Sequence, residues 1–90
     1  MTTDPLQDAI ATEEALRAQL GELVGAKVRA EQESARLRDR ATLPGADPAI
    51  AALATGYAEQ AVRLAAEVEE VRVALRAQEA RTETLRAGAA

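Results

Sequence analysis

The chain has 90 residues, enough for one domain at most. It contains no cysteine and no histidine, which excludes a disulfide framework, thiolate chemistry, and the commonest general base and metal ligand. The net charge of −4 argues against nucleic acid as the main partner. Tyr57 is the single aromatic residue, and Ala, Leu, Glu and Arg dominate, a composition typical of long helices and coiled coils.

A first helix is predicted from Pro5 to about residue 42. Asp4 is a good N-cap, Pro5 fits the first helical position, and Gln7 completes a capping-box pattern. Apolar residues then recur at alternating spacings of three and four, as one face of a helix requires. The members of this stripe are Leu6, Ala9, Leu16, Leu20, Leu23, Ala30, Leu37 and Ala41.

The segment LPGAD, residues 43–47, predicts a turn followed by a second helix over about residues 48–87. Pro44 and Gly45 end the first helix, Asp47 caps the second, and Pro48 takes its first position. The second apolar stripe has the same periodicity. Its members are Ile50, Ala54, Tyr57, Ala61, Leu64, Val68, Val71, Leu75, Thr82 and Leu85.

A turn this short places the two helices antiparallel, so that residues facing each other have numbers that sum to 91. The charges support this register. Residues 1–26 carry a net −4 and residues 27–45 a net +2, whereas residues 46–71 carry −4 and residues 72–90 carry +2. Folding at the turn therefore pairs each acidic quarter with a basic one. We predict an all-α fold: a single domain, residues 1–90, in which two long antiparallel helices form a coiled-coil hairpin.

Polar residues interrupt the apolar stripes in three layers. The predicted opposing pairs are Glu13 with Gln78, Lys27 with Leu64, and Ser34 with Tyr57. We interpret these layers as register control, because a polar residue in the seam penalises a slipped alignment. Lys27 can lay its stem on Leu64 and keep its ammonium in water. Ser34 is expected to share a hydrogen bond with the Tyr57 hydroxyl.

Two glycines, Gly21 and Gly25, lie inside the first predicted helix, where each costs roughly 1 kcal/mol relative to alanine. They belong to an outer stripe of small residues on the face opposite Leu20, and the second helix carries a similar stripe. Our hypothesis is that the stripes dock further helices, most simply those of a second copy in a homodimeric four-helix bundle. The predicted interface residues are Ala11, Ala18, Gly21, Gly25, Val28, Ala35, Val62, Ala66, Val73 and Ala80.

The stretch ARLRDR, residues 35–40, is the main basic cluster of the chain. It supplies Arg36, Arg38 and Arg40, and Arg29 lies two turns before Arg36 on the same helix. We interpret these arginines as partners for acids of the second helix, of which Glu59 is nearest. The alternative is a contact with an anionic small molecule, such as a nucleotide, or with an acidic partner protein.

No pattern in the sequence predicts catalysis or a cofactor. Ser34, the only serine, has no histidine to activate it, and no glycine-rich phosphate loop is present. We therefore expect a non-enzymatic protein–protein interaction module: a small adaptor, scaffold or regulatory protein that pairs with itself and with an unidentified protein. No signal peptide and no membrane-spanning run is predicted, so we expect a cytoplasmic location without membrane contact. The excess of Arg over Lys suggests a bacterial source.

Three alternatives remain open at this stage. One is a ligand-responsive transcription regulator of anti-sigma type that grips an anionic nucleotide through the arginines. Another follows from the length and the hairpin plan, which are similar to those of the small secreted helical hairpins of the type VII pathway. That family carries Trp-x-Gly in its turn, and this chain has no Trp. The third is a phage or plasmid assembly factor.

Overall fold

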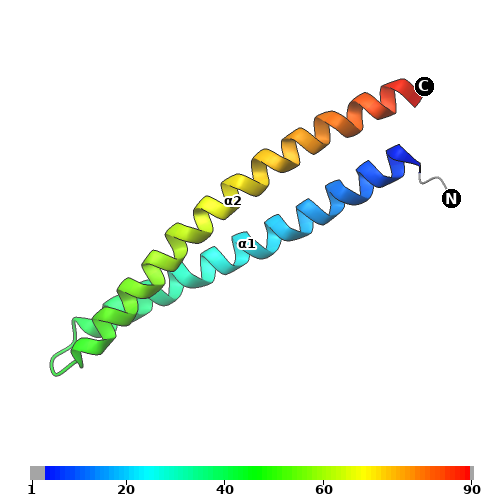
Figure 1. Cartoon of the computed structure of the whole chain (residues 1–90). Helices are drawn as coiled ribbons and strands as arrows, with labels where there is room; N and C mark the ends of the chain where they lie inside the picture. Colours follow the sequence, from blue (N-terminus) through cyan, green and yellow to red (C-terminus); the bar gives the residue numbers. More distant parts are fainter. Residues whose placement is uncertain (1–3, 90) are drawn as a thin grey trace.

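The computed structural model describes residues 4–89 and has the predicted all-α fold, a helical hairpin. Helix α1 spans Pro5–Ala41 and helix α2 spans Pro48–Ala89, close to the expected 5–42 and 48–87. The helices lie side by side in opposite directions, so that the turn forms one end of the molecule, the tip, and the start of α1 and the end of α2 lie at the other, the open end (Figure 1).

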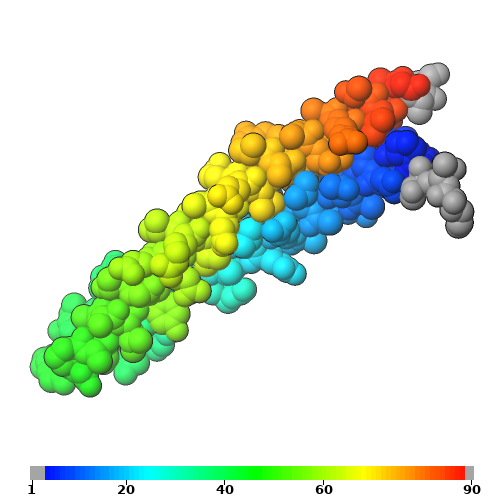
Figure 2. All heavy atoms as spheres, in the orientation of Figure 1, coloured from blue at the N-terminus to red at the C-terminus, as the bar shows by residue number. Residues whose placement is uncertain are grey.

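The molecule is a long rod (Figure 2). Its principal extents are 68 × 22 × 13 Å and its radius of gyration is 20.0 Å. A compact domain of this length would have a radius of gyration of about 12 Å. A rod only two helices wide leaves most of each helix surface in water.

Both helices begin with the same Asp-Pro device. The Asp4 carboxylate accepts a hydrogen bond from the Leu6 backbone N–H at 3.0 Å, and the Asp47 carboxylate accepts one from the Ala49 N–H at 2.9 Å. The proline that follows each aspartate has no N–H to leave unpaired. Within residues 4–89 the side chain of Gln7 makes no hydrogen bond, so the reciprocal half of the predicted capping box is absent.

The turn is built around Pro44 and Gly45. The Leu43 carbonyl accepts a hydrogen bond from the Ala46 N–H at 3.2 Å, and Gly45 has a φ of +78°. Proline at the second position and a positive φ at the third are the features of a type II turn, which is why glycine is needed there. This turn reverses the chain between Ala41 and Pro48, as the sequence predicts.

The two apolar stripes form the seam between α1 and α2. Apart from Tyr57, every residue of the predicted stripes is buried or half-buried. Hydrogen bonds or ion pairs link residue 9 with 78, 34 with 54, and 17 with 79, and these pairs sum to 87, 88 and 96, on both sides of the expected 91. The fully buried residues are Ala9, Ala30, Ser34, Leu37, Ala54, Ala61, Val68, Val71 and Thr82.

The expected hydrogen bond between Ser34 and Tyr57 is wrong. The Ser34 hydroxyl donates instead to the backbone carbonyl of Ala54 at 2.8 Å. Tyr57 is 36% exposed and lies beside the seam. The physical reason is size, since the seam near Ser34 is lined by alanines and a tyrosine ring needs more room than they leave.

In the other two polar layers, each polar side chain pairs with a group other than the residue predicted to oppose it. Glu13 pairs with Arg17 of its own helix at 2.8 Å, and the Gln78 amide donates to the Ala9 carbonyl at 3.3 Å. Lys27 is half-buried, and its ammonium reaches Glu31 at 2.8 Å. Lys27 is thus partly covered while its charge is paired at the surface, as a long charged side chain beside a seam allows.

Candidate interaction surfaces

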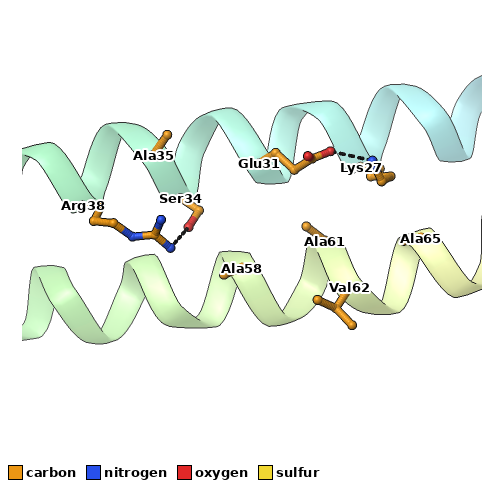
Figure 3. A pocket seen from close by; sticks show the side chains of 9 residues that line it. All are labelled: Lys27, Glu31, Ser34, Ala35, Arg38, Ala58, Ala61, Val62 and Ala65. Carbon is orange, nitrogen blue, oxygen red and sulfur yellow. Dashed lines mark hydrogen bonds and ion pairs between the residues drawn. The ribbon is translucent and has the colours of Figure 1, made fainter.

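Two open grooves run beside the seam in the tip half of the rod. The first, here the Val62 groove, has a volume of about 410 Å³. Its walls come from both helices and are mostly small side chains. They are formed by Lys27, Glu31, Ser34, Ala35 and Arg38 of α1 and by Ala58, Ala61, Val62 and Ala65 of α2 (Figure 3).

The centre of the Val62 groove is apolar, and its charged side chains already have partners. Lys27 pairs with Glu31, and the Arg38 guanidinium donates to the Ser34 hydroxyl at 3.4 Å (Figure 3). Val62 itself is 72% exposed. A valine this exposed contributes little to the hairpin, so its apolar surface is available for another molecule.

Helical periodicity adds two predicted interface residues to this side of the rod. Val28, which is 42% exposed, lies two turns before the groove residue Ala35, and Gly21 lies two turns before Val28. Apart from its two chain neighbours and the adjacent backbone of α1, no described atom lies within 4 Å of the place where a Gly21 Cβ would be. This line of α1 is therefore a smooth, open surface next to Val62.

Gly25 has a local role. A Cβ at this position would lie 3.3 Å from a terminal guanidinium nitrogen of Arg29, which folds back over the glycine. Side chains of a helix point toward its N-terminus, so a residue four positions earlier is the natural platform for Arg29. The other predicted interface residues are exposed in the hairpin: Ala11, Ala18, Ala66, Val73 and Ala80.

The second groove, here the Tyr57 groove, lies on the opposite side of the seam and has a volume of about 690 Å³. It contains two of the four predicted arginines. Its lining residues are Ala26, Arg29, Ala30, Gln32, Glu33, Arg36, Tyr57 and Gln60. The hairpin therefore divides the arginine cluster, because Arg38 lines the Val62 groove instead.

The interpretation that the arginines pair with acids of α2 is not what the structure shows. Arg36 binds Glu33 of its own helix through two hydrogen bonds, one of them at 3.1 Å from Nε. This hydrogen bonding from Arg36 lowers the pKa of Glu33, and the same contact raises the pKa of Arg36. Within residues 4–89 the single ion pair between the two helices is Arg17 with Glu79, at 3.4 Å near the open end.

Two exposed leucines near the tip were not among the predicted site residues. Leu53 is 55% exposed and forms a shallow hollow on α2 together with Gly56 and Tyr57. Leu43 lies in the turn and is also exposed. The sequence could have indicated them, because each is a large apolar residue that lies outside the predicted seam stripes.

The chain was compared with protein-family models, with curated proteins and with solved structures. None of the three comparisons gave a match. Over the residues described, neither α1 nor α2 contains an apolar stretch of the length that a bilayer crossing requires. The same part of the chain brings no three acidic side chains together in a way that could hold a metal ion.

Proposed function

We propose that this protein is a non-enzymatic coiled-coil interaction module, a small cytoplasmic adaptor, scaffold or regulatory protein, that acts by self-association and helix–helix docking. The observation that carries the proposal is the amount of surface left in water. The hairpin exposes 6353 Å², whereas a compact protein of 9.5 kDa exposes about 5,000 Å². The difference, roughly 1,300 Å², is larger than the ~800 Å² that each partner buries in a standard protein interface.

The composition of this surface also favours docking. Valines and leucines such as Val62, Val73 and Leu53 are more than half exposed. Exposed apolar groups contribute nothing to the hairpin itself, and a layer of further helices would remove them from water. A rigid helical surface of this kind is the usual means by which helical modules recognise other helices.

The anion-binding alternative has weaker support. The Tyr57 groove offers Arg29 and Arg36 to a ligand, but the guanidinium of Arg36 is already held by the carboxylate of Glu33. A phosphate entering this groove would have to displace that carboxylate or bind beside it. An acidic groove wall therefore reduces the attraction for any anion.

The test of the proposal is the mass of the protein in solution. Sedimentation equilibrium over a wide concentration range should give a mass that rises toward twice the 9.5 kDa of the chain. The thermal midpoint should rise with chain concentration, because association stabilises only the folded state. A mass that stays at that of one chain throughout, with an unchanging midpoint, would contradict self-association.

A further inference from the structure

The side of the rod that holds the Val62 groove changes character along its length. Ala58, Ala65, Arg72 and Glu79 follow one another at seven-residue intervals along one line of α2. The first two line the groove near the tip, whereas Glu79 forms the ion pair with Arg17 near the open end. This line of α2 is thus apolar in the tip half and charged in the open half.

The net charge of each helix also changes along the rod. Near the open end, residues 4–19 carry four acids and one base, a net −3, and the facing residues 72–87 carry four bases and two acids, a net +2. Near the tip the signs are reversed, with +2 on residues 27–44 and −1 on residues 47–64. At each end, α1 and α2 therefore carry opposite net charge.

We propose that the Val62 groove binds the same groove of a second copy, with both tips at the same end, so that α1 of each copy lies along α2 of the other. This inference rests on the proposed self-association and specifies its surface and direction. A two-fold axis along the rod relates the copies. It places apolar surface on apolar surface at equal height, and it places the acidic open-end segment of each α1 along the basic segment of the other α2.

The pairing across this interface is regular. Val28 of one copy lies at the height of Val62 of the other, and two-heptad steps from these valines lead to Glu14 and Arg76. In the single chain neither Glu14 nor Arg76 has an ion-pair partner among the described residues. Gly21 lies one heptad from Val28, halfway to Glu14, and so also faces the other copy. Its missing side chain lets the helices approach there.

The reverse directions satisfy fewer of these conditions. An antiparallel pair that overlaps over its full length lays the Val62 groove on the charged stretch around Arg72 and Glu79. An antiparallel pair that slides until the two grooves meet leaves both open ends without a partner, and so buries only about half of the rod. The full-length antiparallel pair also lays α2 along α2, so the acidic residues 65–71 would meet their counterparts, whereas with both tips at the same end they lie along α1 of the other copy.

The surface is tested by placing a charge on each side of the seam. Val62→Glu should weaken dimerisation by about 100-fold in sedimentation, because two carboxylates per dimer would enter an apolar interface. Leu53→Glu, on the side of the Tyr57 groove, is the matched control and should leave the dimer within about twofold of the wild type. Helix content by circular dichroism should match the wild type in both variants, since both positions are exposed in the hairpin.

The direction is tested with spin labels, for which the absence of cysteine is convenient. Leu43→Cys labels the tip and Thr84→Cys labels the open end. With the tips together, both positions should give intermolecular distances within about 30 Å, because helix layers pack 8–10 Å apart. Either antiparallel arrangement separates the Thr84 labels by roughly 50 Å or more, at 1.5 Å per helical residue.

The outcomes separate this inference from the proposed function. A wild-type protein that stays monomeric at every concentration overturns both. A dimer that survives Val62→Glu, or that is lost in Leu53→Glu, overturns the surface but leaves self-association standing. A dimer with distant Thr84 labels overturns the direction alone.

Discussion

The tip half and the open half of the seam are built from different side chains. Near the tip the seam consists mainly of alanines, and Ala30, Ala54 and Ala61 are almost completely buried. Near the open end it contains leucines, and Leu16 and Leu75 remain half-buried. These leucines of the open half are therefore less well covered than the alanines of the tip half, and Leu37 near the tip is buried as well.

The reason is the reach of each side chain. A methyl group is covered by the backbone and side chains of the facing helix, whereas the isobutyl groups of Leu16 and Leu75 are only partly covered by it and have no further helix beside them. The close contact near the tip also lets Ser34 reach across to the carbonyl of Ala54. We infer that the hairpin is held together most firmly at the tip, and that the open half depends more on a second layer of helices.

The largest expected effect on the free energy of unfolding comes from replacing one seam leucine with alanine, and we compare this substitution in the two halves. Leu37 near the tip is 5% exposed, so Leu37→Ala should lower the free energy of unfolding by about 3 kcal/mol. Leu16→Ala should cost roughly 1.5 kcal/mol, because Leu16 is only half-buried in the hairpin. Denaturant unfolding followed by circular dichroism at one fixed chain concentration measures both values. Equal losses would show that the open half is covered as well as the tip.

Much of this architecture could be predicted from the sequence, because its signals are local. Asp-Pro at two positions marks both helix starts, and Pro44-Gly45 marks the turn. The short turn then fixes the antiparallel register, which the apolar spacing supports. These features can be predicted without knowing the conformation or packing of individual side chains in the seam.

The details of the site could not be predicted, because they depend on space and on competing partners. Tyr57 has the spacing of a seam residue, but the seam beside it is too narrow for a ring. Arg36 lies near acids of both helices by number, and the one within its own turn of α1, Glu33, is the partner that it binds. Gly25 lies under the guanidinium of Arg29, a contact that its place in the small-residue stripe did not indicate.

A second prediction concerns the contact that distinguishes the tip half. Ser34→Ala removes the hydrogen bond from α1 to the Ala54 carbonyl and should lower the free energy of unfolding by about 1 kcal/mol. Thr12→Ala is the control in the open half, since among the described residues the Thr12 hydroxyl bonds only to the Asp8 carbonyl of its own helix, at 2.9 Å. This control should change stability by less than ~0.5 kcal/mol. A Ser34→Ala protein as stable as the control would show that the bond between the helices contributes nothing.

The smallest expected effect is the pH dependence that Glu33 supplies near the tip. The hydrogen bond from Arg36 lowers the pKa of Glu33 below its ordinary value of 4.5. The folded state therefore gains stability from this carboxylate above pH 4.5, and loses it as the pH falls through the lowered pKa. Because the pair is open to solvent, the gain is small.

Glu33→Gln should accordingly lower the thermal midpoint slightly at pH 7 and have a smaller effect at pH 2, because the wild type loses this contribution as the pH falls through the lowered pKa of Glu33. Glu22→Gln is the control on the same helix, since Glu22 has no ion-pair partner among the described residues. Thermal unfolding of the three proteins at both pH values measures the difference. A pH-independent effect of Glu33→Gln would mean that its contact with Arg36 acts through packing and not through charge. A pH-dependent effect would show that charge stabilises α1 near the tip, because the Arg36–Glu33 pair lies within one turn of that helix. The Arg17–Glu79 pair near the open end instead joins the two helices.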